Sequence, residues 1–117
     1  MRILILEDDP FIASDLQMIL EEDGHEIVGI FGSLAETYDH LEDGFDYALL
    51  DVDVVGGKSF GVATALVERD IPFAFVSASQ PGDLPQSLGQ VIFIQKPFDE
   101  SAILQSVSET SSRLYSC

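Results

Sequence analysis

The sequence predicts an α/β fold: a doubly wound parallel sheet with helices on both faces. Five short apolar runs alternate with stretches in which apolar residues recur at helical spacing. Such alternation favours parallel strands joined by right-handed helical crossovers. With 117 residues, of which 46% are hydrophobic, the chain can bury one core of its own, and we expect a single domain over 1–117.

The first two elements are a strand and a helix separated by acids. The run RILILE (2–7) is rich in isoleucine and leucine, as buried strands are. Asp9 is a favoured N-cap residue and Pro10 suits the first helical turn, so a helix is expected to begin there and to end near Gly24. Its apolar stripe is Ile12, Leu16, Ile19 and Leu20.

The next three elements repeat the pattern. HEIVGIF (25–31) predicts a second strand, and Ser33 is expected to cap a helix that continues to Gly44. The stripe of that helix is Leu34, Tyr38 and Leu41. YALLDV (47–52) predicts a third strand, which again ends on an acid.

The second half of the chain contains one segment in which the helical pattern is weak. After the Gly56-Gly57 loop, a helix is predicted whose stripe is Val62, Ala63, Leu66 and Val67, and PFAFVS (72–77) follows as the fourth strand. Two prolines and two glycines in 80–90 limit any fourth helix to one or two turns. VIFIQKPF (91–98) predicts the fifth strand, and Asp99 is expected to cap the final helix.

Composition restricts the partners and the location. Five basic against 21 acidic side chains give a formal charge of −16, which repels nucleic acids and anionic membranes, so proteins or cations are the expected partners. Cys117 is the one cysteine, which excludes an internal disulfide and a thiolate metal site. The sequence lacks a signal-peptide pattern and an apolar run of membrane-spanning length, so we expect a cytoplasmic protein.

Charged and polar residues gather where the predicted strands end. In an open parallel sheet the functional crevice lies beyond the carboxyl ends of the strands. Those ends carry Glu7 and Asp8, Asp51, Ser77 and Lys96. Like charges about 4 Å apart repel by roughly 4 kcal/mol at an effective dielectric constant near 20, so the acids need a positive partner. Hard carboxylate oxygens suit Mg²⁺.

Four short motifs carry a resemblance to a known family. ILILEDDP, ALLDVD, FVSAS and QKPF, in this order and at these separations, resemble the receiver domain of bacterial two-component response regulators. The resemblance spans essentially the whole chain and implies a five-stranded sheet of flavodoxin-like order 2-1-3-4-5. Because no output domain follows the last predicted helix, we expect a single-domain response regulator that acts as a phosphate shuttle or sink, or switches protein contacts.

The resemblance also implies a site. Asp51 matches the phosphoacceptor, which would take a phosphoryl group from the phosphohistidine of a sensor histidine kinase or phosphotransfer protein. Glu7, Asp8 and Asp51, with the backbone carbonyl of Asp53, match the Mg²⁺ ligands, and Mn²⁺ is a possible substitute. Self-phosphorylation and self-dephosphorylation are the only chemistry expected, rather than enzymatic turnover.

Three further residues match the signalling part of the family's site. The Ser77 hydroxyl would bond one phosphoryl oxygen and Lys96 would pair with another, while Phe93 matches the aromatic that swings on activation. Lys96-Pro97 matches the family's cis peptide. A downstream protein of unknown identity is the expected output, with the receiver itself a monomer or weak dimer.

Two alternatives remain open. A receiver-like fold can regulate by docking without being phosphorylated, although the complete set of site residues argues against this reading. LLDVDV (49–54) also resembles the DxD motif of haloacid-dehalogenase-like phosphohydrolases, in which Asp53 would be the general acid. That family places the motif on its first strand and needs a cap and an acidic metal motif well after its lysine, whereas here the motif follows the third predicted strand and only 21 residues follow Lys96.

Overall fold

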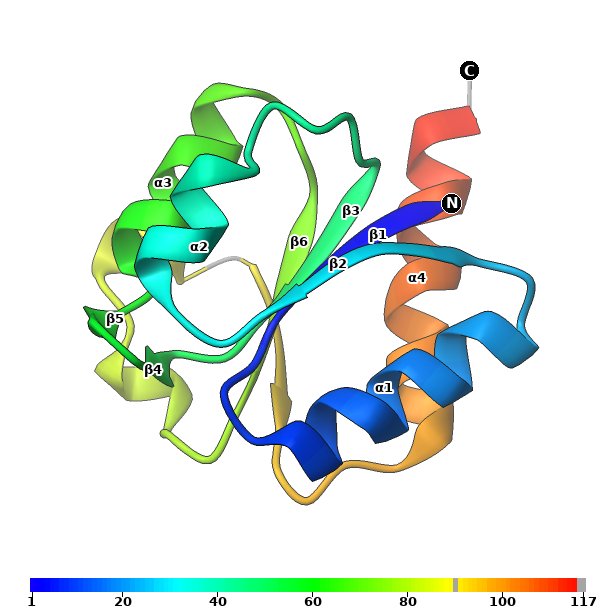
Figure 1. The fold of residues 1–117 in the computed structure, drawn as a ribbon, viewed down its shortest axis with the longest axis horizontal. Coiled ribbons are helices and arrows are strands. Elements are labelled where there is room, and N and C mark those ends of the chain that lie inside the picture. The colour runs from blue at the N-terminus through cyan, green and yellow to red at the C-terminus, as the bar shows by residue number, and fades with distance from the viewer. Residues whose placement is uncertain (90, 116–117) are drawn as a thin grey trace.

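A computed structural model confirms the predicted α/β fold (Figure 1). It describes residues 1–89 and 91–115, with side chains up to Thr110, so Cys117 lies outside the described residues. The five parallel strands have the order β2-β1-β3-β6-β7, which is the expected order 2-1-3-4-5 in chain numbering of the main sheet. These strands are β1 (Arg2–Leu6), β2 (Glu26–Phe31), β3 (Tyr47–Leu50), β6 (Phe73–Ser77) and β7 (Ile92–Gln95).

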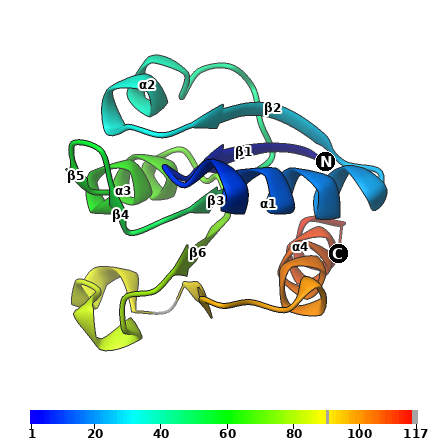
Figure 2. The ribbon, with the colours of Figure 1, turned by 60° about the horizontal axis from the view of Figure 1, so that its bottom comes forward.

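Helices cover both faces of the sheet. α1 (Pro10–Glu22) and α4 (Glu100–Tyr115) lie on one face, and α2 (Leu34–Asp39) and α3 (Phe60–Glu68) lie on the other (Figures 1 and 2). Among the residues with described coordinates, no helix is both long and apolar enough to span a bilayer.

Alternate residues of the central strands pack into two separate apolar layers, one on each face of the sheet. Ile3 and Ile5 of β1 pack with α1 and α4, whereas Leu4 and Leu6 pack with α2 and α3. Side chains of a strand point to opposite faces in turn, so a strand covered on both faces must be apolar throughout. This explains the unbroken apolar run of β1 and holds the ends of β1 and β3 side by side at the centre of the molecule.

The predicted helix caps at Asp9 and Ser33 are confirmed. The Asp9 carboxylate accepts hydrogen bonds from the backbone N–H groups of Phe11 and Ile12, at 2.9 and 3.4 Å, and the Ser33 hydroxyl accepts from the N–H of Glu36 at 3.2 Å. These bonds satisfy amides that the first turn of a helix leaves free.

Three details of the helix predictions are wrong. Tyr38, predicted in the apolar stripe of α2, is 47% exposed. α2 ends at Asp39 instead of Gly44, because residues 40–43 turn, with Asp43 N bonded to His40 O at 3.1 Å, and this turn places both Leu41 and Phe45 in the core. Val67 of α3 is 52% exposed. The buried stripe of this short helix is narrower than predicted.

The chain also forms a hairpin that the sequence did not predict. β4 (Asp53–Val54) and β5 (Gly57–Lys58) pair antiparallel around a two-residue turn directly after the third main strand. Gly56 and Gly57 have φ values of +105° and +129°, which side chains disfavour. The predicted loop at Gly56-Gly57 is confirmed, and it takes the form of this turn.

In the segment before β7, the described residues 80–89 form single turns rather than a longer helix. η1 (Pro81–Asp83) and η2 (Gln86–Leu88) are short 3₁₀ turns in place of a fourth helix, as the prolines and glycines predicted. Leu88, which is 3% exposed, anchors the segment to the core. In Figure 2 the segment lies beyond β6 at the lower left.

Candidate functional site

Three carboxylates meet where β1 and β3 end. Leu6 and Leu50 are register partners, so Glu7 and Asp51 follow on neighbouring strands. The N–H of Asp51 donates to Leu6 O at 2.8 Å, which fixes the two backbones together. One carboxylate oxygen from each of Glu7, Asp8 and Asp51 lies within 4.8 Å of the others. The sequence therefore predicted this acid cluster correctly.

Lys96 brings the opposite charge to the acid cluster. Its Nζ lies 2.5 Å from Oε1 of Glu7 and 3.0 Å from Oδ2 of Asp51. The lysine follows β7, so its side chain reaches across from the far side of β6. Glu7 and Asp51 are 4% and 8% exposed. At this depth a carboxylate requires a cation or a proton, and Lys96 supplies the cation.

Burial and pairing together shift the pKa values of Glu7 and Lys96. Burial raises the pKa of Glu7 from 4.5 to about 7, and the Asp51 charge adds to the rise, while hydrogen bonds from Lys96 and from the Asp9 N–H oppose it. Burial lowers the pKa of Lys96, but hydrogen bonds and charge attraction from Glu7 and Asp51 outweigh it, so the pKa is raised. The lysine therefore stays charged at neutral pH.

The raised pKa of Glu7 predicts a falling stability between pH 4.5 and 7. Folded Glu7 keeps a proton that the unfolded chain has already lost, so its contribution to stability is full below pH 4.5 and disappears as the pH passes 7. At about 1.4 kcal/mol per pH unit, the fall is at most about 4 kcal/mol. Urea unfolding at several pH values, in metal-free buffer, should show this fall in the wild type and lose it in Glu7→Gln.

The matched control for this experiment is Glu22→Gln, because Glu22 is an exposed acid on α1. It should retain the wild-type slope. Asp53, whose pKa is lowered below 3.8 by bonds from Lys58 and Ser79, contributes stability that is lost only under more acidic conditions. Equal slopes in the wild type and Glu7→Gln would contradict the shifted pKa of Glu7.

Ser59 is a site residue that the sequence reasoning missed. Its hydroxyl is fully buried and donates to the backbone carbonyl of Asp51 at 2.6 Å. Ser59 precedes α3, where serine is expected to cap the helix through its side chain, yet no such cap bond forms. The hydroxyl instead fixes the backbone of Asp51. No sequence signal separates these two uses of a serine.

Asp53 lies outside the acid cluster with its side chain engaged elsewhere. Its carboxylate pairs with Lys58 and accepts a hydrogen bond from Ser79 Oγ at 2.8 Å. Ser59 N donates to Val52 O at 2.9 Å, so the adjoining Asp53–Lys58 pair is a non-hydrogen-bonded pair of the hairpin. The Asp53 carbonyl thus faces away from β5. Its predicted role as a metal ligand remains a prediction.

Ser77 and Phe93 lie on β6 and β7, the two strands that follow β3 across the sheet. Ser77 ends β6, is 1% exposed, and accepts a hydrogen bond on Oγ from the N–H of Ser79 at 3.2 Å. Its carbonyl accepts from the N–H of Lys96 at 3.0 Å. Phe93 of β7 is half-buried against Phe75, with ring centroids 6.3 Å apart. Their predicted switching roles remain predictions.

The donor set of the acid cluster fits a hard divalent cation. Three carboxylate oxygens lie close together, and Asp8 is exposed while its two companions are buried. Mg²⁺ binds one or two carboxylates, keeps several waters and prefers an anionic oxygen in its remaining positions. The exposed side at Asp8 leaves room for these. Mn²⁺ suits the same oxygen ligands.

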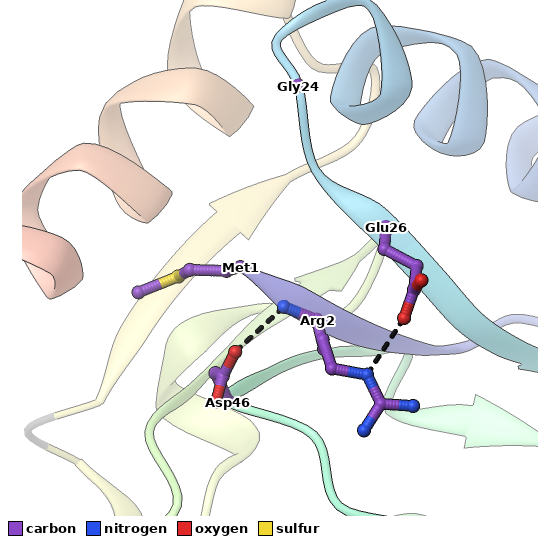
Figure 3. A pocket seen from close by; sticks show the side chains of 5 residues that line it. All are labelled: Met1, Arg2, Gly24, Glu26 and Asp46. Atoms are coloured by element: carbon purple, nitrogen blue, oxygen red, sulfur yellow. Dashed lines mark hydrogen bonds and ion pairs between the residues drawn. The ribbon is translucent and has the colours of Figure 1, made fainter.

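A shallow pocket at the opposite edge of the sheet has different chemistry (Figure 3). It lies at the start of β1 and is lined by Met1, Arg2, Gly24, Glu26 and Asp46. Nε of Arg2 pairs with Glu26 at 2.8 Å, and the backbone N–H of Arg2 donates to Asp46 at 2.8 Å. The guanidinium is therefore already engaged by the protein itself.

Like Arg2, the other basic residues with described side chains are engaged by acids of the protein itself. The four basic side chains that the structure describes each pair with a carboxylate. The pairs are Arg2–Glu26, Lys58–Asp53, Arg69–Glu42 and Lys96 with both Glu7 and Asp51. Among the side chains that the structure describes, most of the 21 acids have no such partner.

Fold and site together define a class of protein. Response regulator receiver domains have a parallel sheet of this order, paired acids after the first strand, an acid after the third and a lysine after the fifth. No family model matches the sequence.

Individual proteins do match it. SdrG from Sphingomonas melonis Fr1 is 36% identical with a TM-score of 0.82, over 94% of this chain and 95% of SdrG. The non-phosphorylated receiver domain of HemR from Leptospira biflexa is 27% identical with a TM-score of 0.80, over 95% and 94% of the two chains. The chain belongs to the receiver family of response regulators.

Curated relatives are longer. The transcriptional regulatory protein PdtaR of Mycobacterium tuberculosis is 29% identical over 117 aligned positions, which cover 96% of this chain and 57% of PdtaR. The chain thus spans little more than half the length of that relative.

Proposed function

We propose that this receiver accepts a phosphoryl group on Asp51 from the phosphohistidine of a sensor histidine kinase or phosphotransfer protein. The observation that carries the proposal is the position of the Asp51 carboxylate, held in the acid cluster with Lys96 Nζ at 3.0 Å. Glu7, Asp8, Asp51 and the backbone carbonyl of Asp53 would hold Mg²⁺ there. The modified receiver then changes its protein contacts, or stores and passes on the phosphoryl group.

The transfer requires an anionic nucleophile to approach an anionic donor. A carboxylate oxygen of Asp51 forms the new O–P bond as the N–P bond of phosphohistidine breaks, and the imidazole leaves with the electron pair and takes up a proton. Bound Mg²⁺ supplies positive charge that offsets the repulsion between these anions. Lys96 supplies a further positive charge from the protein.

The backbone of the site keeps the nucleophile in place. Asp51 is bonded through its N–H to Leu6 and through its carbonyl to Ser59, at 2.8 and 2.6 Å. These two bonds fix the backbone from which the Asp51 side chain extends. Such positioning is the main contribution a protein makes to phosphoryl transfer. After transfer, Lys96 and Ser77, which stand at the ends of the neighbouring strands β7 and β6, would each bond a phosphoryl oxygen.

The ionisation of Asp53 argues against the phosphohydrolase alternative. A general acid must carry a proton near neutral pH. Bonds from Lys58 and Ser79 lower the pKa of Asp53 instead, so the side chain stays ionised. We therefore propose a phosphoacceptor that turns over only its own phosphoryl group. A domain that regulates by docking, without phosphorylation, remains the second candidate, because docking requires the receiver fold but not the acid cluster.

The test is phosphoryl uptake from acetyl phosphate, measured by intact mass and a phosphate-affinity gel. The wild type with Mg²⁺ is expected to gain the mass of one phosphoryl group, and chelation of the metal should abolish the gain. No uptake with Mg²⁺ would favour the docking module. Continuous release of phosphate from a general phosphatase substrate would favour the phosphohydrolase.

A further inference from the structure

A hydrogen-bonded clasp joins two loops beside Asp51. Lys58 on β5 pairs with one oxygen of Asp53, and Ser79, just after β6, donates its hydroxyl to the other at 2.8 Å. These three residues, Lys58, Asp53 and Ser79, are called the clasp below. It ties the β4–β5 hairpin to the loop that follows β6.

The clasp also connects to Ser77. The backbone N–H of Ser79 donates to Ser77 Oγ at 3.2 Å while the Ser79 side chain bonds Asp53. A continuous chain of hydrogen bonds therefore runs from Lys58 through Asp53 and Ser79 to the hydroxyl that the proposed function directs at a phosphoryl oxygen. The Ser77 hydroxyl is thus linked by hydrogen bonds to both loops.

We infer that the clasp is a positioning device that holds the Ser77 loop in its resting place, so that a phosphoryl group on Asp51 must compete with it. The inference rests on the proposed function. Ser79 and Asp53 act through Ser77, and neither has to touch the phosphoryl group for this role.

The expected strengths of the clasp's ion pair and hydrogen bond are those of a restraint that can be released. Lys58 and Asp53 have side chains 57% and 55% exposed, so their ion pair alone adds little to stability. Its effect is to orient the Asp53 carboxylate toward Ser79. A partly exposed hydrogen bond of this kind changes an equilibrium by on the order of fivefold. Bonds to a dianionic phosphoryl group are stronger, so phosphorylation can overcome the clasp.

The first arm of the test uses the unphosphorylated protein. Ser79→Ala removes the hydroxyl but keeps the backbone N–H and every charge, so amide hydrogen exchange at residues 77–80 should accelerate by on the order of fivefold. Ser79→Thr keeps a hydroxyl and should restore the wild-type rate. Ser14→Ala, an exposed serine on α1, should change nothing. Unchanged exchange in Ser79→Ala would overturn the clasp.

The second arm measures competition with a phosphoryl group. Beryllofluoride with Mg²⁺ mimics a phosphoryl group on a carboxylate, and its binding can be followed by ¹⁹F NMR. Ser79→Ala should bind it on the order of fivefold more tightly than the wild type, because no clasp bond has to break. Ser79→Thr and Ser14→Ala should match the wild type.

The two hypotheses fail in distinguishable ways. Equal or weaker beryllofluoride binding by Ser79→Ala, in a wild type that does bind it, overturns the competition and leaves the proposed function standing. A wild type that neither binds beryllofluoride nor takes up a phosphoryl group overturns both. Equal urea midpoints for all variants would show that the differences are local.

Discussion

Replacing Asp51 by asparagine is expected to abolish phosphoryl uptake from acetyl phosphate. The amide keeps the size of the side chain and leaves the backbone bonds to Leu6 and Ser59 intact, but it removes the nucleophilic oxygen. Loss of a nucleophile lowers rates in enzymes by on the order of a thousandfold or more. Intact mass after incubation with Mg²⁺ should therefore show no added phosphoryl group in Asp51→Asn.

The control for this variant is Asp15→Asn. Asp15 is an exposed acid on α1, so the same chemical change there should leave uptake at the wild-type level. Circular dichroism and urea unfolding would verify that Asp51→Asn is folded. Equal labelling of Asp51→Asn and the wild type would show that another residue accepts the phosphoryl group.

Replacing Lys96 by methionine is expected to destabilise the protein by about 3 kcal/mol at neutral pH without metal. The variant leaves the buried carboxylates of Glu7 and Asp51 facing each other without the ammonium that now lies 2.5 and 3.0 Å from them. Added Mg²⁺ should stabilise Lys96→Met more than the wild type, because no ammonium competes for the same oxygens. Urea midpoints with and without Mg²⁺ measure both effects.

Arg69→Met is the matched control. It removes an exposed ion pair, with Glu42 at 2.8 Å, at the opposite end of the sheet, and should cost less than about 1 kcal/mol with no Mg²⁺ dependence. Identical Mg²⁺ increments in Lys96→Met and the wild type would indicate that the ion does not bind at the acid cluster.

The central strands and the acid cluster could be predicted because few physical alternatives exist for them. β1 and β3 are covered on both faces, so their apolar runs stand out in the sequence. Once two strands are parallel neighbours, their register places Glu7 beside Asp51. The reach of Lys96 to these acids follows from its position after β7, at the same edge of the sheet.

Features that depend on tertiary contacts could not be predicted. The strands β4 and β5 have two residues each, which is too short for an alternating pattern to be recognised. The bond from Ser59 to Asp51 and the clasp at Asp53 join residues whose pairing depends on how the loops fold. The early end of α2 likewise follows from the burial of Leu41 and Phe45, which helical spacing alone does not specify.

The pairing of the basic side chains has a consequence at long range. Since Arg2, Lys58, Arg69 and Lys96 are each neutralised by a neighbouring acid, and the formal charge is −16, the electric field around the receiver is negative. A partner with a basic docking face is attracted before contact. Its association rate should fall as added salt shortens the screening length, about 10 Å at 0.1 M.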